Sequence, residues 1–555
     1  MSFLFKTKPM EHQVRAYDFA HDKDYFAWFM EMGTGKTKTT IDLASNWYKE
    51  GLIDAVLVIA PNGVHTQWGK EQIPIHSPID FTAVVFKSTA SKALKDKIHS
   101  IIYDPEPKLK WFMVNVEAFS YPTYLSLFRT FLENWRTFIV IDESTGIKNP
   151  DAKRTMNIIR GLSITKYRGK SVISCTPLSV KRAILTGTPI TNSPFDLWAM
   201  FEFLKPSYFN RTYYSFKAHY GLEKKVDMWQ GAVQRSVTMP LKPEEIKEIR
   251  AAEGDDYYAI CAKYGLKESD VQYIKDHEDC TVPYKYLEEL KELIAPTSFF
   301  VRKDECLDLE PKIYKRRVIQ MDDEQQRLYS ELEHQYITEF RDQEVSVLNK
   351  VVLYTRLSQI CGGFIPYEDD ETGEKTATSI GKNPKAEALV EEIMLCDYPC
   401  IVVTRFTAEA QYLYELLSKK FDNLNIGLYI GPRKEPKDVL EQFKAGFIHV
   451  LIANERMISK GHNLQNAHNV FFFSNSYSLE DREQTEDRIH RNGQTEKCVY
   501  MDLIMHGSMD MKVYAALKAK KKLLDYFRDT SIEATLNEVT DDMQQEFQGW
   551  FQGGL

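Results

Sequence analysis

Cysteine is sparse in this chain, long apolar runs are missing, and basic residues do not outnumber acidic ones. The eight cysteines are scattered, and only Cys396 and Cys400 lie close together, so we expect free thiols in a reducing compartment and no structural metal. No apolar run approaches the length of a membrane span, and the first residues lack a signal-peptide core. These absences predict a cytoplasmic protein without a membrane partner.

The formal net charge is −8, which excludes a protein coated with basic surface. Nucleic acid is still allowed as a partner, because phosphate binding needs a local basic groove and not a basic total. With 555 residues the chain is too long for one core, so two or more domains are expected.

Continuous apolar runs alternate with helical patterns in the first third of the chain, and the same rhythm restarts near Asn383. The first set lies at residues 55–60, 83–86, 111–114, 138–141 and 183–185, and the second at residues 400–403, 427–430, 449–453, 470–473 and 499–504. Runs that are apolar throughout are typical of parallel strands covered by helices on both faces. The sequence therefore predicts an α/β fold with two doubly wound parallel-sheet lobes.

Changes of pattern define the predicted boundaries. After about residue 210 charge density rises, strand-like runs disappear and helical patterns dominate. The predicted parts are a first lobe (1–210), a helical insertion (211–300), a helical linker between the lobes (301–380), a second lobe (381–508), and a C-terminal bracing helix with an acidic tail (509–555). The tail is either frayed or a docking peptide for a protein partner.

Residues 257–277 have the spacing of a helix-turn-helix, with its turn at Gly265. In that motif the second helix enters the major groove of DNA. Glu268 and Asp270 on this helix would repel phosphate. Two interpretations therefore stay open, contact with DNA and a helical hairpin that only packs.

A phosphate loop is predicted at Gly33, Thr34, Gly35, Lys36 and Thr37, between a strand-like run and a helical pattern. This context places backbone N–H groups and a helix N-terminus against an anion. Lys36 would reach the β- and γ-phosphates of ATP, and Thr37 would ligate Mg²⁺.

Two further motifs follow buried runs and are expected at the carboxyl edge of the same sheet, where open α/β sheets bind ligands. Asp142 would hold Mg²⁺ through water, and Glu143 would polarise the attacking water. Thr186, Gly187 and Thr188 would sense the γ-phosphate and pass its loss to the other lobe. They also fit a capped turn before the next helix, and both interpretations can hold together.

Far downstream, Arg488 and Arg491 are three residues apart on a predicted helix, hence on one face. They belong to the second lobe, whereas the phosphate loop belongs to the first. An arginine that reaches across would stabilise transition-state charge, a contribution of about 10³–10⁵ in rate in other systems. Hydrolysis would then require closure of the lobes, which converts ATP turnover into domain motion.

In this order the motifs resemble those of the Swi/Snf-type, chromatin-remodeller-like ATPases of helicase superfamily two, over most of residues 1–525. The resemblance implies that the two predicted lobes are RecA-like. Residues 184–198 are close to the third motif of that family. Residues 484–494 match Gln-x-x-Asp-Arg-x-His-Arg-x-Gly-Gln, a pattern that separates the family from other helicase-like groups. The compact build is similar to bacterial and bacteriophage members, which implies the cytoplasm of a bacterium or of a virus-infected host cell.

The resemblance implies further roles. Gln13, in the opening motif Pro-Met-Glu-His-Gln, takes the place of the glutamine that reads adenine, and Gln484 joins the catalytic set. Residues 58–68 look like the motif that lays the first lobe on a DNA strand. The implied DNA contacts are Thr66, Gln67, Trp68, Thr404, Lys460 and Asn463.

The chain departs from the family pattern in three places. Thr145 stands where the family usually has histidine, which puts coupling in doubt but leaves the nucleotide chemistry intact. The motif at residues 458–464 keeps one glycine where the family often has three. Residues 164–182 are longer than the pattern needs, and they are either a flexible basic loop that touches phosphate or a set of solvated lysines. The basic residues of this stretch are Lys166, Arg168, Lys170, Lys181 and Arg182.

Together these inferences predict a DNA-dependent ATPase that uses ATP and Mg²⁺ to translocate on duplex or branched DNA, largely independently of sequence. A strand-separating or fork-remodelling, annealing helicase is one alternative, and a motor on RNA is a lesser one. An alternative of another class is a nucleotide-gated DNA-binding protein with little turnover. The complete hydrolytic set argues against it, because a binding protein needs no catalytic base.

Overall fold

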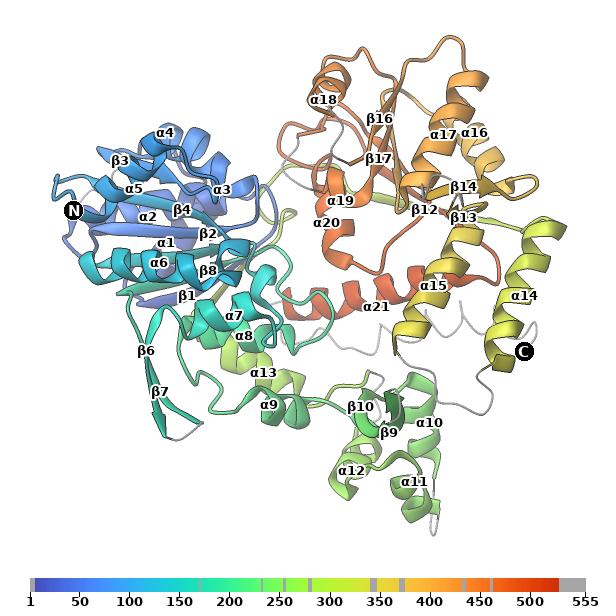
Figure 1. Cartoon of the computed structure of the whole chain (residues 1–555), viewed down its shortest axis with the longest axis horizontal. Helices are drawn as coiled ribbons and strands as arrows, with labels where there is room; N and C mark the ends of the chain where they lie inside the picture. Colours follow the sequence, from blue (N-terminus) through green and yellow to red (C-terminus); the bar gives the residue numbers. More distant parts are fainter. Residues whose placement is uncertain are drawn as a thin grey trace. The chain divides into compact units, whose positions relative to one another are not determined.

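The structure is a computed structural model that describes residues 5–168, 171–230, 233–252, 256–277, 282–339, 347–368, 375–431, 436–459 and 463–528. The chain divides into two compact units (Figure 1). Of the described residues, the first unit holds 5–220, 286–308 and 523–528, and the second holds the rest.

A seven-stranded sheet forms the centre of the first unit, in the order β11-β1-β8-β5-β2-β4-β3, with every neighbouring pair parallel. Its strands are β1 (Tyr25–Met30), β2 (Ala55–Ala60), β3 (Phe81–Val85), β4 (Leu109–Asn115), β5 (Thr137–Asp142), β8 (Lys181–Leu185) and β11 (Ser298–Val301). All residues of β2, β5 and β8 are buried. Burial on both faces explains why these runs are apolar throughout instead of alternating.

The helices of the first unit lie before β1 or between its strands along the chain. They are α1 (Glu11–His21), α2 (Lys36–Lys49), α3 (Val64–Gln67), α4 (Ile73–His76), α5 (Lys92–Tyr103), α6 (Pro122–Asn134), α7 (Lys153–Ile159), α8 (Asp196–Leu204), α9 (Tyr213–Tyr220) and α13 (Leu287–Ile294). Large aromatic side chains fill the core, and Trp47 of α2 lies edge-on to Phe138 of β5 at 5.1 Å between ring centroids. Buried aromatic rings of this size supply much of the apolar area of a core.

The second unit has its own parallel sheet of six strands, in the order β12-β19-β18-β15-β17-β16. Its strands are β12 (Ile313–Ile319), β15 (Cys400–Thr404), β16 (Ile426–Tyr429), β17 (Val450–Asn454), β18 (Asn469–Phe472) and β19 (Val499–Met505). Its helices are α14 (Asp323–Glu339), α15 (Val347–Cys361), α16 (Pro384–Leu395), α17 (Thr407–Lys420), α18 (Pro436–Lys444), α19 (Glu455–Ile458), α20 (Leu479–Asp487) and α21 (Met509–Arg528). The last turns of α21 belong to the first unit. The prediction of two doubly wound parallel-sheet lobes is confirmed.

Each sheet also takes one edge strand from outside the range predicted for its lobe. Strand β11 comes from the predicted insertion and β12 from the predicted linker. The residues of β12 are exposed or half-buried, so the strand lacks the continuous apolar run on which the prediction relied.

The predicted helical insertion contains a β-hairpin that the sequence analysis missed. Strands β9 (Glu223–Gln230) and β10 (Val233–Pro240) pair antiparallel, and they precede α10 (Pro243–Ala251), α11 (Asp256–Tyr264) and α12 (Glu268–Asp276). A small core that includes Leu222, Ile249 and Ile274 joins these elements. A two-stranded hairpin needs no buried run, and polar strands such as these leave little signal in hydrophobicity. A second hairpin, β13 (Phe364–Glu368) and β14 (Lys375–Ser379), lies in the predicted linker.

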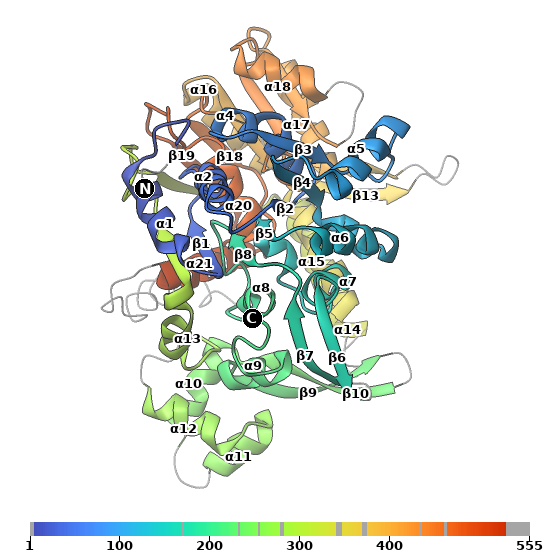
Figure 2. The ribbon, with the colours of Figure 1, turned by 90° about the vertical axis from the view of Figure 1, so that its left-hand side faces the viewer.

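The hypothesis of a flexible basic loop or solvated lysines at residues 164–182 is wrong for Lys181 and Arg182. Lys166 is exposed, and Lys170 lies outside the described residues. Strands β6 (Ser163–Arg168) and β7 (Ser171–Pro177) form an antiparallel hairpin that projects from the first unit (Figures 1 and 2), and Lys181 and Arg182 open the buried strand β8. Lys181 Nζ lies 2.9 Å from Asp24 Oδ1. Arg182 is 2% exposed and donates to the carbonyls of Phe203 and Leu162. These two charges stabilise the fold and are not available to a solvated loop.

Candidate active site

The phosphate loop connects the end of β1 to α2 in the first unit. Gly33 and Gly35 have φ of 83° and 92°, a region that favours glycine, and Gly35 is the N-cap of α2. The Thr34 hydroxyl donates to the Glu31 carbonyl at 2.7 Å. Lys36 Nζ donates to the Met30 carbonyl at 2.8 Å. The loop therefore places its lysine and the N-terminus of a 14-residue helix at one point, which suits a bound phosphate.

Gln13 packs directly on this loop. Its side-chain Nε2 donates to the Thr34 carbonyl at 3.1 Å, and its Oε1 accepts from the Met10 N–H at 3.0 Å. A Cβ at Gly35 would lie only 2.2 Å from Gln13 Nε2, so glycine is required here by contact as well as by φ. The amide keeps a second hydrogen and a second lone pair for a ligand.

Asp142 and Glu143 stand at the carboxyl end of β5, as the sequence predicts. Asp142 is 6% exposed, and its Oδ2 accepts from the indole Nε1 of Trp68 at 2.7 Å. Burial raises the pKa of Asp142, while the Trp68 hydrogen bond and the Lys36 charge oppose the rise. Glu143 has φ 51° and ψ 60°, a left-handed conformation that is uncommon outside glycine. Such backbone strain is concentrated at functional sites.

Thr186, Gly187 and Thr188 follow β8 and lie against the phosphate loop. The Thr186 N–H donates to the Trp28 carbonyl at 3.1 Å, and the Thr186 hydroxyl accepts from the Thr188 N–H at 3.1 Å. A Cβ at Gly187 would meet Met32 N at 3.3 Å. The first unit thus brings together the predicted phosphate loop, the Asp-Glu pair and the proposed sensor residues.

In the second unit, the arginines predicted to share a helix face do not lie on a helix. Helix α20 ends at Asp487, Arg488 is its C-cap, and Arg491 lies in the turn that follows. The Glu486 carbonyl still accepts from His490 N at 3.0 Å and also from Tyr500 Oη at 3.0 Å. The Arg488 carbonyl accepts from Leu464 N at 3.0 Å, a donor from outside the helix. The inference that Arg488 and Arg491 share one face of a helix is therefore wrong.

The two arginines and Gln484 have different surroundings. The Arg488 guanidinium donates through Nε and Nη2 to the Ser459 carbonyl at 3.0 and 2.6 Å. Arg491 is half-buried; burial lowers its pKa, and the Asp487 carboxylate opposes this. Gln484 is half-buried in α20, with its Nε2 3.5 Å from Glu480 Oε1.

Sequence analysis missed an ionic network that holds α20. Arg482 donates to both oxygens of Asp502 at 2.6 and 3.1 Å and to Glu486 Oε1 at 2.7 Å. Lys312 Nζ lies 3.0 Å from Glu486 Oε2 and 3.3 Å from Asp487 Oδ1. Burial alone would lower the pKa of Lys312, but these carboxylates raise it well above the usual value. The residues come from distant segments, so no spacing in one sequence could reveal the pairing.

Two predicted DNA contacts are contradicted by burial. Trp68 is 1% exposed and supports Asp142, and Thr404 is fully buried with its hydroxyl directed to the Ala453 carbonyl. A side chain without exposed surface cannot contact a DNA backbone. Of the remaining candidates, Thr66 and Gln67 are half-buried, Asn463 is exposed, and Lys460 lies outside the described residues.

The helix-turn-helix candidate is a packed hairpin of α11 and α12. Val271 and Ile274 are fully buried, and buried Asp270 forms an ion pair with Lys285. The exposed residues of α12 are Glu268, Ser269, Gln272 and Asp276. An exposed face with two acids and no base disfavours phosphate, so the packing interpretation is the better supported one.

The fold and the phosphate loop define a P-loop protein with two parallel-sheet lobes. The SNF2-related domain model matches residues 28–362, and the model of the helicase conserved C-terminal domain matches residues 384–493. The chain belongs to the SNF2-related family. The resemblance found in the sequence is thereby confirmed.

Individual relatives are distant. YwqA of Bacillus subtilis is 24% identical over 429 residues, which cover 75% of this chain and 38% of YwqA. The SWI/SNF chromatin-remodeling complex subunit snf22 of Schizosaccharomyces pombe is 23% identical over 522 residues, 89% of this chain and 26% of that protein. The chain thus spans well under half the length of these two relatives. The Sulfolobus solfataricus SWI2/SNF2 ATPase core in complex with dsDNA aligns over the whole of both chains with 20% identity and a TM-score of 0.37.

In the part of the chain that the structure describes, no helix combines the length and hydropathy needed to cross a membrane.

Proposed function

We propose that this chain is a DNA-stimulated ATPase that hydrolyses ATP to ADP and phosphate and translocates on duplex DNA. The observation that carries the proposal is the convergence, within the first unit, of the phosphate loop, the Asp142–Glu143 pair and the Thr186–Thr188 loop. A protein that only bound nucleotide would need the loop but not the strained glutamate beside it.

The residues present fit ATP with Mg²⁺. Lys36 would exchange its contact with the Met30 carbonyl for phosphate oxygens, and Thr37 and Asp142 would hold Mg²⁺, which neutralises phosphate charge. Gln13, with its spare hydrogen and lone pair, would pair with the edge of adenine. Glu143 would orient the attacking water. Such positioning and charge compensation account for most catalysis of phosphoryl transfer.

Gln484, Arg488 and Arg491 would act on the γ-phosphate from the second unit when the units close. Of the two arginines, Arg491 is the better candidate for the transition state, because the Arg488 guanidinium already binds the Ser459 carbonyl. Closure that depends on ATP and reopening that follows phosphate release would give alternating grip on DNA.

DNA as the partner is supported by family membership and by similarity to a chromatin-remodeling complex subunit. Thr66, Gln67 and Asn463 remain candidate contacts, and Lys460 stays a prediction from sequence. Contacts to phosphates should make binding tolerant of sequence and sensitive to salt.

The test is the ATPase rate of the full chain on a panel of duplex, single-stranded and forked DNA and duplex RNA, with triplex displacement and strand displacement measured in parallel. We expect duplex DNA to stimulate hydrolysis and the motor to displace a triplex strand without separating the duplex. Strand separation would instead indicate a helicase. An ATPase rate that no nucleic acid changes would overturn the proposal.

A further inference from the structure

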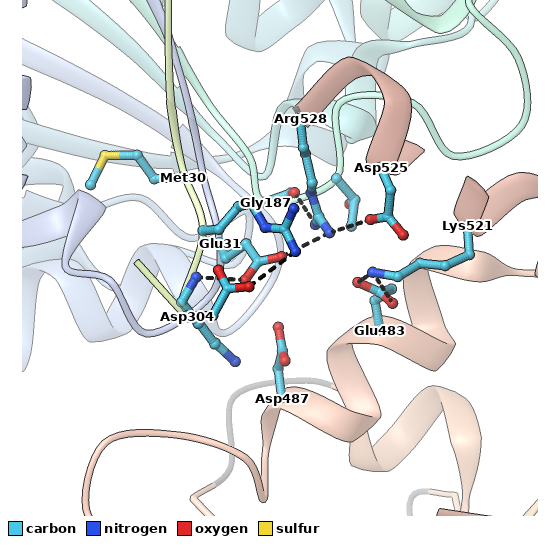
Figure 3. A network of polar contacts seen from close by, with 12 residues as sticks. Met30, Glu31, Gly187, Asp304, Glu483, Asp487, Lys521, Asp525 and Arg528 are labelled. Carbon is cyan, nitrogen blue, oxygen red and sulfur yellow. Dashed lines mark hydrogen bonds and ion pairs between the residues drawn. The ribbon is translucent and has the colours of Figure 1, made fainter. Parts of the chain in front are cut away.

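The end of helix α21 reaches the phosphate loop of the first unit. Arg528, the last residue of the helix, is 5% exposed, and its Nη1 lies 2.8 Å from Glu31 Oε1. Its Nη2 donates to the Gly187 carbonyl at 2.5 Å. Figure 3 shows the guanidinium directed at both groups. One side chain therefore contacts the loop that would hold phosphate and the loop that would sense it.

Glu31 is well placed to transmit this contact, because it belongs to the phosphate loop itself. Its carbonyl accepts from the Thr34 hydroxyl at 2.7 Å and from Lys36 Nζ at 3.3 Å. Its N–H donates to the Val301 carbonyl at 2.9 Å, and its Oε2 accepts from Lys303 N at 2.8 Å. Glu31 therefore links Arg528 to the backbone segment whose carbonyls, those of Met30 and Glu31, accept from Lys36 Nζ.

The contact is charged and largely removed from water. Bonds between guanidinium and carboxylate are among the stronger hydrogen bonds in proteins, and they gain strength where water is excluded. The Gly187 carbonyl uses the second arm of the same planar group, which a lysine could not reproduce. The arrangement fixes the distance between the phosphate loop and the Thr186–Thr188 loop.

The turn that carries Arg528 has a second, separate anchor in the first unit. Tyr526 Oη donates to Glu288 Oε1 of α13 at 2.8 Å, and Lys291 Nζ lies 4.8 Å from the Tyr526 ring centroid. Helix α21 is continuous, and its residues up to Lys522 belong to the second unit. The residues of the helix from Leu523 on belong to the first unit, together with the phosphate loop.

We infer that Arg528 is a positioning residue of the ATP site, which holds Glu31 and the Gly187 carbonyl so that Lys36 and the sensor threonines keep their places. The inference rests on the proposed ATPase function. Arg528 acts through these groups and does not touch the reacting atoms. An intact C-terminal helix thereby becomes a requirement for ATP turnover.

The test compares Arg528→Gln, Glu31→Gln, the double variant and Arg528→Lys in the full chain. We expect each single Gln variant to lower kcat/KM for ATP about tenfold, the scale of one lost charge-assisted hydrogen bond. The double variant should lose less than about twofold more than Arg528→Gln alone, because both single changes remove the same ion pair between Arg528 and Glu31. Arg528→Lys should recover part of the loss, since it keeps the charge but not the fork.

The matched control is Tyr526→Phe, which removes a hydrogen bond from the same turn without touching the phosphate loop. It should leave kcat/KM within about twofold of the wild type. Equal losses in Tyr526→Phe and Arg528→Gln, or fully additive losses in the double variant, would overturn the inference.

Affinity for the fluorescent analogue mant-ATP separates this inference from the proposed function. If the wild type hydrolyses no ATP, the proposed function fails, and a weaker mant-ATP affinity in Arg528→Gln but not in Tyr526→Phe still supports the positioning role. If the wild type is active and Arg528→Gln matches it in both affinity and turnover, only the inference fails.

Discussion

At the scale of single residues, the unusual backbone of Glu143 supports its proposed role in hydrolysis. Its left-handed conformation is held at the end of a fully buried strand. A residue held in a costly backbone conformation is unlike an ordinary turn residue. The conformation therefore favours a role for Glu143 in orienting water over the interpretation that it only ends the strand.

Glu143→Gln should bind ATP with near-normal affinity and hydrolyse it about 10²–10⁴-fold more slowly, because the amide cannot polarise the attacking water. Lys36→Ala should by contrast lose both binding and turnover. The two are compared by mant-ATP titration and by steady-state phosphate release. Near-normal turnover in Glu143→Gln would show that another group activates the water.

Trp68, a candidate for DNA contact in the sequence, is a buried residue that donates to Asp142, the residue proposed to hold Mg²⁺. Trp68→Phe keeps most of the buried ring but removes the N–H that holds Asp142. We expect about a tenfold loss of kcat/KM for ATP, the effect of one hydrogen bond to a charged group. Binding to duplex DNA without nucleotide should not change.

The matched control for this variant is Trp111→Phe. Trp111 is a buried neighbour at 6.2 Å between ring centroids, and its indole nitrogen has no hydrogen-bond partner among the described residues. Its ATPase rate should stay close to that of the wild type. If the two variants lose activity equally, core packing rather than the bond to Asp142 explains the loss.

At the scale of elements, the ionic network around α20 places the segment that carries Gln484 and leads to the arginines. Glu486 is shared between Arg482 and Lys312, and it also accepts from Tyr314 Oη at 2.7 Å. Buried charges of this kind are costly to leave without a partner. The helix is therefore held by electrostatics more than by an apolar stripe.

Lys312→Met should destabilise the second unit by about 3 kcal/mol, because it removes one partner of a buried ion pair. ATP turnover should fall as well, since Arg488 and Arg491 follow α20 directly. Adding Glu486→Gln should cost less than the sum of the single changes. Chemical denaturation and ATPase rates measure both effects.

Arg317→Met is the control from the same region. Arg317 pairs with Glu391 and Glu392 but is 34% exposed, so its loss should cost no more than about 1 kcal/mol. Equal loss of unfolding free energy in Lys312→Met and Arg317→Met would show that the network around α20 stabilises the unit no more than an exposed ion pair does.

At the scale of the whole molecule, the second unit contains two buried glutamates whose protonation should make its stability depend on pH. Burial raises the pKa of Glu409 to about 7, against a hydrogen bond from Ser474, and burial likewise raises the pKa of Glu455 to about 7. Because both folded-state values lie above the unfolded value, the folded unit binds more protons between about pH 4.5 and 7. Its stability should therefore fall as pH rises through this window.

Glu409→Gln removes one of these protonation equilibria while keeping the side-chain shape. Relative to the wild type, the variant should gain up to about 3 kcal/mol of unfolding free energy between pH 5 and pH 8. Denaturant titrations at several pH values provide the measurement. A difference between variant and wild type that does not change with pH would contradict the assigned role of Glu409.

The sequence by itself determined the two parallel sheets, the phosphate loop and the family, because continuous apolar runs and short contiguous motifs are local properties of the chain. It failed for the hairpins β6–β7 and β9–β10, which need no buried run, and for the end of α20, where Leu464 N donates to the Arg488 carbonyl.

Only the tertiary structure decided what the buried polar groups do. Trp68 and Asp142 are 74 residues apart, and Arg528 and Gly187 are 341 apart, so their hydrogen bonds leave no periodic trace in the sequence. The same holds for Lys181 and Arg182, which composition presents as loop charges and the fold buries in β8. Whether one of these side chains is buried depends on which strands and helices lie next to it. The packing of the whole unit determines those neighbours.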